Sequence, residues 1–314
     1  MTRPGGRAAG WPLVSVILPT RGRPELVRES IRSVVEQTYP GPIDCLVVHD
    51  QEDPDPELSA LGRQARTVSV TTNSGTPGLA GSRNYGVSVV AGDFLASCDD
   101  DDLWHPAKLA RQMRRMLREP DLLVLGAGIR LLMPNGKIVA WPGDRPVVSQ
   151  DDLVRSRRKE LHSSTLVMRR RAYELAGGYD ENLPDSYAED YEWLLRVCQY
   201  GRIGVITEPL TDVRKGAHSW FADRAAVTAD ALEYLLRRHP ELARSRRGHA
   251  RVLGQIAFAR ATLGDRAQAR RWAAQALRVH PFAPHAALAV VYSVSRLDPK
   301  WALKGTRAIG RGIS

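Results

Sequence analysis

The sequence predicts an α/β fold in which a mostly parallel sheet is flanked by helices and followed by an all-helical segment. Strand patterns occur at residues 13–18, 45–48, 67–71 and 94–98, and helical patterns separate them. Strands and helices that alternate in this way are typical of a parallel sheet with helices on both faces. No strand pattern appears after about residue 222.

The first strand and helix set the pattern for this sheet. The apolar run at residues 13–18 ends in a polar loop, and Pro24 is suited to the first turn of a helix. Apolar residues recur on one face of that helix as far as the Pro-Gly-Pro turn at residues 40–42. A second helix is expected over residues 79–90, with Arg83 near its middle.

The rhythm changes after the fourth strand. A helix is expected over residues 106–118, and the Pro-Asn-Gly turn at 134–136, between apolar runs, favours a β-hairpin. Further strands are expected at 163–168 and 204–206. A helix over 189–200 begins with acidic residues, which the helix dipole favours at that end.

Composition indicates a globular protein with a basic surface. The 314 residues are 43% hydrophobic and 25% charged, and the formal net charge is +10. That sign fits nucleic acid, an anionic membrane surface or a phosphorylated substrate, and charge alone does not choose among them. The three cysteines have no metal-type spacing, so we expect buried thiols in a reducing compartment.

No targeting or membrane-spanning segment is expected. The first residues lack the apolar core of a signal peptide, and no apolar run is long enough to cross a bilayer. We therefore expect a cytoplasmic protein. Its basic tail, residues 290–313, could lie on the inner face of an anionic membrane.

Four consecutive carboxylates, Asp99 to Asp102, follow the fourth strand directly. Adjacent carboxylates raise one another's cost of ionisation, so such a cluster needs either a cation or full solvation. A solvated acidic turn is the alternative to a metal site. The run lies at the carboxyl end of an expected central strand, where open α/β sheets bind their ligands, and this position favours the metal site.

Several motifs occur in an order that resembles family 2 glycosyltransferases of the GT-A fold. The resemblance covers about residues 12–220. Each motif is weak alone, but the ordered set is specific. In chain order the motifs are Val14-Ser15-Val16-Ile17-Leu18-Pro19-Thr20, Asp50, Ser82-Arg83-Asn84-Tyr85-Gly86, Gly92-Asp93-Phe94-Leu95, Asp99 to Pro106, Gly177-Gly178-Tyr179-Asp180, Glu189-Asp190 and Arg214-Lys215-Gly216-Ala217-His218.

The resemblance implies a divalent cation that bridges the diphosphate of a nucleotide-sugar donor. Counting back from Pro106 aligns Asp99 and Asp101 with the two acids of the family's DxD motif. Asp101 is the preferred metal ligand, and Asp100 or Asp99 would contact the ribose or a metal-bound water. Asp102 is expected to start the following helix. Hard oxygen donors of this kind suit Mg²⁺ or Mn²⁺.

The resemblance also implies residues that contact the donor. Asp50 corresponds to the residue that contacts the nucleobase edge, with a surface loop acid as the alternative. Its neighbours depart from the usual pattern, which leaves the base open. Pro19, Thr20 and Arg21 would touch the nucleoside. Arg83 would lie near the diphosphate as a bidentate donor, unless it is an exposed helix arginine.

Asp190 matches the catalytic base of the family, and the implied reaction inverts the anomeric configuration in one displacement. The alternative, a helix N-cap, is compatible with that role. His218 lies where some relatives place a metal-binding or diphosphate-binding histidine, and a surface histidine is the alternative. His162 is a weaker candidate on the acceptor side.

The predicted organisation has a short N-terminus and two domains. Residues 1–11 precede a GT-A glycosyltransferase domain over 12–221, with a nucleotide-sugar-binding half, 12–105, and an acceptor half, 106–221. A helical subdomain is expected over 222–314, with three successive helices. Part of it resembles a tetratricopeptide helix pair, although an array of such repeats needs roughly three units.

The function implied is metal-dependent transfer of a sugar from a nucleoside-diphosphate sugar to a hydroxyl acceptor. One rival is a sugar-1-phosphate nucleotidyltransferase, which would release pyrophosphate and has no use for Asp190. A second rival is a non-catalytic interaction protein that binds through its basic helical tail. No nucleic-acid motif accompanies that tail. The sugar, nucleobase, acceptor and oligomeric state are not readable from the sequence.

Overall fold

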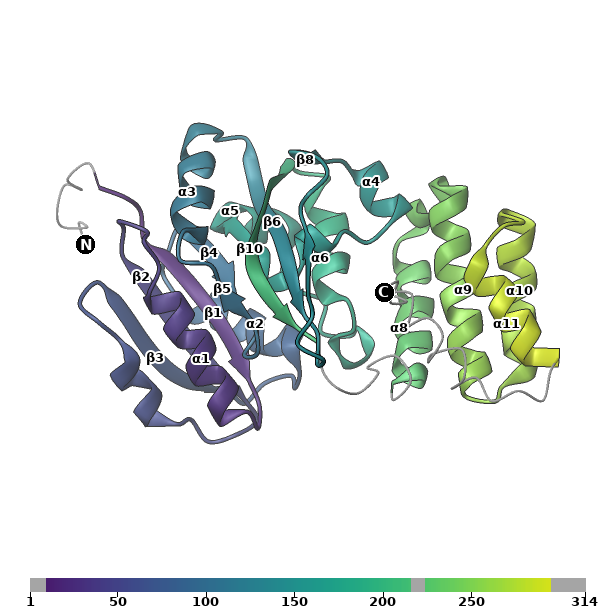
Figure 1. The fold of residues 1–314 in the computed structure, drawn as a ribbon, viewed down its shortest axis with the longest axis horizontal. Coiled ribbons are helices and arrows are strands. Elements are labelled where there is room, and N and C mark those ends of the chain that lie inside the picture. Colours follow the sequence, from purple (N-terminus) through teal and green to yellow (C-terminus); the bar gives the residue numbers. More distant parts are fainter. Residues whose placement is uncertain (1–9, 216–223, 295–314) are drawn as a thin grey trace. The chain divides into compact units, whose positions relative to one another are not determined.

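The computed structural model describes residues 10–215 and 224–294 (Figure 1). The chain divides into two compact units. Unit 1 comprises residues 1–148, 159–181 and 196–215, and unit 2 comprises residues 149–158, 182–195 and 216–314. The predicted boundary after residue 221 falls outside the described residues and stays a prediction, as does the proposed role of His218.

Unit 1 begins with a Rossmann-like succession of parallel strands and helices. Strands β1 to β4 pair in the order β3-β2-β1-β4, and all of these pairs are parallel, which agrees with the parallel sheet expected from the sequence. The elements are β1 Val14–Thr20, α1 Pro24–Val35, β2 Ile43–Asp50, η1 Pro56–Leu61, β3 Arg66–Asn73, α2 Leu79–Val89 and β4 Phe94–Ser97.

The second half of unit 1 extends the same sheet with mixed pairing. Its order continues from β4 as β9-β6-β10-β5, and the predicted hairpin is formed by β6 and β7. The elements are β5 Leu103–Trp104, α3 Lys108–Arg118, β6 Leu122–Leu132, β7 Ile138–Trp141, β8 Val147–Val148, η2 Lys159–Leu161, η3 Ser163–Thr165, β9 Val167–Arg169, α5 Arg170–Ala176 and β10 Arg202–Arg214.

Helices cover both faces of the sheet. Alternate residues of β1 point to opposite sides and are mostly apolar on both, so each face needs a helix to bury it. Val14, Val16 and Leu18 share one core with residues of α1 and α3. Helix α2 packs on the other face, where a Cβ added to Gly86 would lie 2.6 Å from Ile17 Cγ2. The glycine therefore permits the close approach of α2 to the sheet.

Three local predictions are wrong in detail. The strand expected at 163–168 begins instead with η3, because Thr165 Oγ1 donates to the backbone oxygens of Glu160 and His162 and closes a turn. The short strand expected at 204–206 is the much longer β10, whose register shifts around Pro209 obscure its alternation. Helix α3 begins at Lys108 rather than at Pro106.

Unit 2 is helical over its described residues. Beyond residue 224 it contains one more α-helix than the three expected. The elements are α4 Gln150–Arg155, η4 Pro184–Ser186, α6 Glu189–Val197 (in unit 2 as far as residue 195), α8 Ala225–Arg238, η5 Pro240–Arg244, α9 Arg246–Thr262, α10 Arg266–Val279 and α11 Pro284–Val294.

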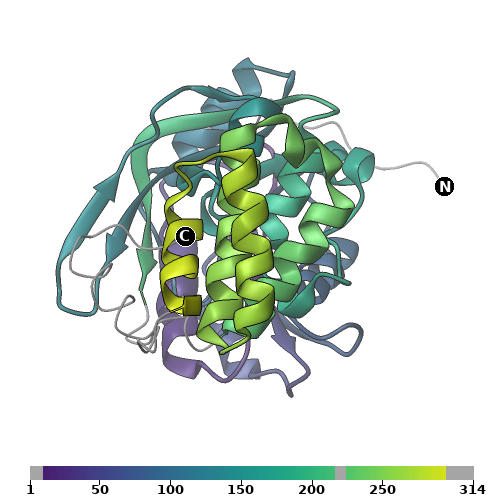
Figure 2. The same cartoon turned by 90° about the vertical axis from the view of Figure 1, so that its right-hand side faces the viewer.

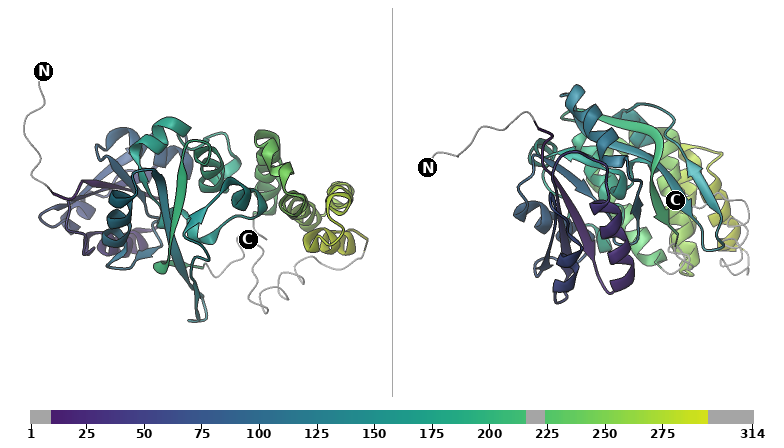
Figure 3. Two further views of the ribbon diagram at one scale, coloured as in Figure 1. Left: turned by 90° about the horizontal axis from the view of Figure 1, so that it is seen from above. Right: turned by 60° about the vertical axis from the view of Figure 1, so that its left-hand side comes forward.

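Helices α9, α10 and α11 pack on one another, and α8 packs on α9 (Figures 2 and 3). Alanines dominate the core between them, which allows the helix axes to approach closely. The turn from α9 to α10 uses Gly264 at a φ of +80°, and the Asp265 side chain then accepts from Gln268 N to cap α10. The tetratricopeptide character stays a prediction. Among the described helices, none has the length and apolarity needed to span a membrane, and the tail proposed to lie on one falls mostly outside the described residues.

A buried charged cluster in unit 2 makes its stability depend on pH. His239 lies between two carboxylates, with Nε2 3.0 Å from Glu192 Oε1 and Nδ1 2.8 Å from Glu241 Oε1. Burial alone would lower the pKa of His239, but the hydrogen bonds to Glu192 and Glu241 raise it above its ordinary value of 6.5. The protonated imidazole therefore stabilises the fold fully below pH 6.5, and this contribution is lost as the pH rises through the raised pKa.

We expect His239→Gln to lower the unfolding free energy by about 3–5 kcal/mol at low pH, because it leaves buried Glu192 without its charged partner. The difference from wild type should shrink as the pH rises. Calorimetry from about pH 5.5 to about pH 9 would measure this difference, because that range begins below the ordinary histidine pKa and ends well above it. The control is His280→Gln, which changes a partly exposed histidine of the same unit. A difference that stayed constant with pH would contradict the charged pairing.

Candidate functional site

The candidate site lies at the carboxyl ends of β1 and β4. These two parallel strands are neighbours, and β2 lies on the other side of β1, so the order of strands reverses between them. Open α/β sheets form a crevice at such a point. Thr20 ends β1, and the acidic run Asp99 to Asp102 follows β4. The sheet therefore brings two polar segments together that are far apart in the sequence.

Asp99 is fixed by a buried arginine. Arg83 is 1% exposed, and its Nη2 donates to Asp99 Oδ1 over 2.6 Å while its Nε donates to Ser97 Oγ. Ser163 Oγ donates to Asp99 Oδ2 over 2.8 Å. Burial alone would raise the pKa of Asp99, but the charges of Arg83 and His162 lower it below its ordinary value. Asp99 is thus held ionised in one orientation.

Asp100 and Asp101 share a different arginine. Arg23 Nη1 donates to Asp100 Oδ1 over 2.9 Å and to Asp101 Oδ2 over 3.0 Å. Thr20 Oγ1, at the end of β1, donates to Asp100 Oδ2 over 2.8 Å. Asp101 has the most exposed side chain of the four aspartates, at 31%. Burial raises the pKa of both carboxyls, and the charge of Asp99 raises that of Asp101 further.

The prediction that Asp102 starts the following helix is wrong, because Asp102 precedes the short strand β5 and is a buried member of the cluster. Its side chain is 1% exposed. Its Oδ1 accepts from Arg214 N over 3.3 Å, whereas the buried Oδ2 has no hydrogen-bond partner among the described residues. Burial, followed by the charges of Asp99 and Asp101, raises the pKa of Asp102 well above its ordinary value.

The donor set fits a divalent cation. Asp99, Asp102 and His162 each offer a ligand atom within 4.8 Å of the others, and His162 Nδ1 lies 3.6 Å from Asp102 Oδ2. Four ionised aspartates opposite the two guanidiniums of Arg23 and Arg83 would leave two negative charges. A cation would offset these charges, and Asp102 Oδ2, which has no partner among the described residues, could coordinate it.

The residues expected at the nucleoside lie at the ends of β1 and β2. Asp50 is buried and accepts hydrogen bonds from Gly78 N, Ser82 Oγ and Asn73 Nδ2. The exposed Arg21 lies 3.6 Å from Asp50 Oδ2. Pro19 is a buried residue of β1 beside Thr20. Asp50 is the last residue of β2, and its hydrogen bonds order the loop that leads into α2.

Asp190 belongs to unit 2, near the start of α6. The residue is 4% exposed, and its Oδ1 accepts from Tyr191 N. Arg157 Nη2 lies 2.9 Å from Asp190 Oδ1 and 3.2 Å from Oδ2. Burial alone would lower the pKa of Arg157, but Asp190 raises it. Asp190 therefore carries a permanently charged partner.

Sequence reasoning missed several of these partners. Arg23, Ser163 and Arg157 carry no motif of their own, and each reaches its aspartate from a distant part of the chain. Only Arg23 had a usable signal, since it lies three residues after the strand end that faces the acidic run. His162 was named only weakly, although it lies beside Asp102.

The geometry defines an α/β protein with an acidic site at the switch point of its sheet, and comparison with known families makes this specific. The family model described as "Glycosyl transferase family 2" matches residues 15–173, about half of the chain. The chain belongs to glycosyl transferase family 2. The match includes β1, the acidic run and α2, and it confirms the resemblance drawn from the sequence motifs.

Among curated proteins, similar chains are glycosyltransferases. An uncharacterised glycosyltransferase of Rickettsia bellii is 26% identical over 199 residues, which cover 62% of this chain and 28% of that protein. The Escherichia coli protein WfgD, a UDP-Glc:alpha-D-GlcNAc-diphosphoundecaprenol beta-1,3-glucosyltransferase, is 33% identical over 106 residues, covering 34% and 42%. The matches thus span less than two thirds of these relatives' length.

Solved structures share the fold. Staphylococcus aureus TarS (residues 1–349) in complex with UDP-GlcNAc matches with a TM-score of 0.59 at 16% identity, covering 95% of this chain and 92% of that one. The mannosyltransferase PcManGT from Pyrobaculum calidifontis, in complex with GDP-Man and Mn²⁺, matches with a TM-score of 0.57 at 18% identity, covering 96% and 81%. The predicted fold class is confirmed.

Proposed function

We propose that the protein is a metal-dependent, inverting glycosyltransferase that moves a sugar from a nucleoside-diphosphate sugar to a hydroxyl acceptor. The observation that carries this proposal is the acidic run at the switch point of a family 2 chain, in which the buried Asp102 Oδ2 has no hydrogen-bond partner among the described residues. Two solved neighbours bind UDP-GlcNAc and GDP-Man, which supports a nucleotide-sugar as donor.

The cation would be Mg²⁺ or Mn²⁺, held by the acidic run. Asp101 has the most accessible carboxylate, and Asp99 is the most firmly ionised, so these two are the proposed ligands. Asp102 and His162 lie close enough to complete the set. When bound, the cation would act as a Lewis acid toward the charge that builds on the leaving diphosphate. The Mn²⁺ in the PcManGT complex supports this choice of metal.

The donor would lie across the strand ends. Pro19, Thr20, Arg21 and Asp50 would contact the nucleoside, and Asp100 would position the ribose through the link to Thr20. Arg83 has a further proposed role. Its guanidinium is enclosed and bonded to Asp99 and Ser97, so it would act on the diphosphate chiefly by orienting Asp99.

Asp190 would be the general base that accepts the proton of the acceptor hydroxyl. Its carboxylate is held in place by the ion pair with Arg157, at 2.9 Å, and a general base has to be positioned in this way. Asp190 would take the proton from the hydroxyl as that hydroxyl attacks the sugar. The proposed inverting displacement then occurs in one step, without a covalent intermediate. His218 is kept as a proposed metal or diphosphate ligand.

A thermal-shift screen of nucleoside diphosphates, each with and without Mn²⁺, would test the proposal. We expect one nucleotide to raise the melting temperature only when Mn²⁺ is present, because ligands that bind the folded state stabilise it. The nucleotide that does so identifies the donor base. Stabilisation by a nucleoside triphosphate together with a sugar 1-phosphate, with pyrophosphate released, would instead support the nucleotidyltransferase.

A further inference from the structure

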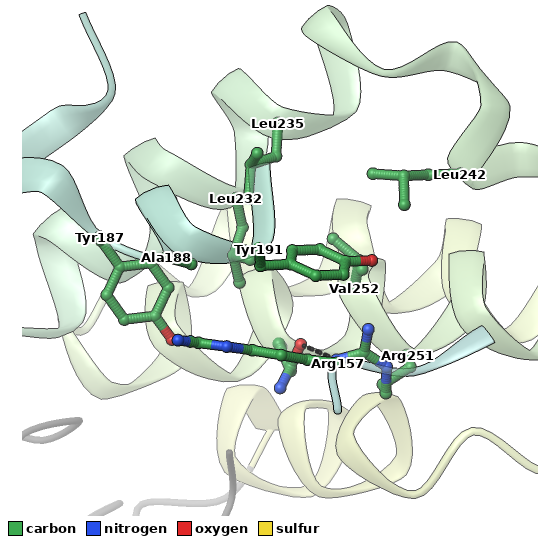
Figure 4. A pocket seen from close by; sticks show the side chains of 10 residues that line it. Arg157, Tyr187, Ala188, Tyr191, Leu232, Leu235, Leu242, Arg251 and Val252 are labelled. Carbon is green, nitrogen blue, oxygen red and sulfur yellow. Dashed lines mark hydrogen bonds between the residues drawn. The ribbon is translucent and has the colours of Figure 1, made fainter. Parts of the chain in front are cut away.

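Unit 2 contains a pocket that the proposed donor site does not use. The ≈390 Å³ of empty space counted there includes open solvent at its mouth, so the enclosed part is much smaller. Leucine and valine side chains form one wall, and polar side chains form the other (Figure 4). The polar residues that line the pocket are Arg157, Tyr187, Tyr191, Arg251 and Gln255.

The pocket holds more positive charge than the described residues neutralise. Arg157 is paired with Asp190, and no ion pair joins Arg251 to a carboxylate in residues 10–215 and 224–294. The Arg251 guanidinium contacts Gln255 Oε1, at 3.2 Å, and the hydroxyl of Tyr191. Arg251 Nε is shielded from solvent and has no hydrogen-bond partner in the described part of the chain.

The excess positive charge also affects the pKa values of Arg251 and His285. Burial lowers the pKa of Arg251, and the nearby positive charge of Arg157 lowers it further. Burial lowers the pKa of His285 to about 4, and the charge of Arg251 contributes to that shift. A partly enclosed cation without a counter-ion is costly to maintain, whereas a bound anion would neutralise it and give the shielded Nε an acceptor.

We propose that this pocket binds an anionic, phosphate-type group of the acceptor substrate through Arg157 and Arg251. Guanidinium groups suit phosphate oxygens because their N–H donors form a planar fork. The apolar wall, which includes Leu232, Leu235 and Val252, would contact the uncharged part of the molecule next to that group.

The link to the acceptor rests on the proposed function. Arg157 lines the pocket and also donates a hydrogen bond to Asp190, the proposed base. Arg157, Asp190 and the pocket all belong to unit 2. An acceptor anchored at Arg157 and Arg251 by its anionic group would bring a hydroxyl near Asp190. The pocket thus assigns an acceptor class, a phosphorylated compound, that the sequence left open.

The test is binding of inorganic phosphate and pyrophosphate to the full chain, in EDTA and at constant ionic strength, by calorimetry. We expect saturable binding to wild type that is at least tenfold weaker in Arg251→Met. Arg247→Met is the matched control, since Arg247 is an exposed arginine of the same helix, and its affinity should stay within twofold of wild type. Asp101→Asn, in unit 1, should also bind normally, which separates this pocket from the donor site.

A structural role for Arg251 is distinguished by stability without anion. If the arginine awaits an anion, Arg251→Met should melt at or above the wild-type temperature in chloride buffer and should lose the rise that pyrophosphate gives wild type. Arg251→Lys, which keeps the charge but loses the fork, should bind at least threefold more weakly. Absence of binding to wild type, unchanged binding in both Arg251 variants, or a melting temperature of Arg251→Met below wild type would overturn the proposal. Anion binding without any glycosyl transfer would contradict the proposed function alone.

Discussion

Asp101→Asn is expected to reduce cation-dependent transfer about 10³-fold, because a lost metal ligand removes several kcal/mol of charge stabilisation in the transition state. The substitution keeps the shape of the side chain and removes its charge. Asp101 has the most accessible carboxylate of the run, and among the described residues its side chain hydrogen-bonds to Arg23, so the fold should be little affected.

The measurement is kcat/KM for nucleoside diphosphate release, together with the Mn²⁺ affinity of the variant. Asp53→Asn is the control, because it removes the same charge from an exposed loop of unit 1. Normal turnover and normal Mn²⁺ affinity in Asp101→Asn would mean that other members of the cluster hold the cation. Asp102→Asn would then be the variant to measure, since Asp102 Oδ2 lacks a partner in the described chain.

Asp190→Asn should lower kcat by about 10²–10⁴-fold while leaving donor affinity unchanged, because it removes a general base that the donor does not need for binding. The asparagine oxygen can still accept from Arg157 and Tyr191 N, so the start of α6 should keep its geometry. Single-turnover kinetics and a nucleotide binding assay would separate the two effects.

Asp151→Asn provides the control for Asp190→Asn, since Asp151 is an exposed acid in the first turn of α4 in the same unit. Near-normal turnover in Asp190→Asn would show that the base assignment is wrong. A variant that lost donor affinity as well would indicate that Asp190 acts on the nucleotide rather than on the acceptor.

Much of the fold was readable because it rests on local patterns. The parallel order of the first strands follows from strand and helix alternation, and the β6–β7 hairpin follows from its Asn-Gly turn. The strand β10 was underestimated because Thr207 and Glu208 interrupt its apolar pattern at a bulge, while pairing with β6 keeps it extended. Tertiary pairing overrode the local signal there.

The candidate site was only partly readable, for a physical reason. Asp99 to Asp102 stand out as a charge cluster, but adjacent residues in a turn point in different directions, and the sequence does not say which are enclosed. The enclosure of Asp102 follows from its packing beside β10 and His162. The pairing of Arg157 with Asp190, and the shielding of Arg251 Nε from any acceptor among the described residues, depend on contacts between segments distant in sequence.

The most direct test of the central claim is the nucleotide product formed from nucleoside-diphosphate sugars in the presence of Mn²⁺, resolved by ion-exchange chromatography. With the donor found by thermal shift, and with water as the background acceptor, we expect nucleoside diphosphate to accumulate. Its formation should stop when EDTA is added and should be about 10³-fold slower with Asp101→Asn. Release that continues in EDTA, or pyrophosphate formed from a sugar 1-phosphate and a nucleoside triphosphate, would contradict the account.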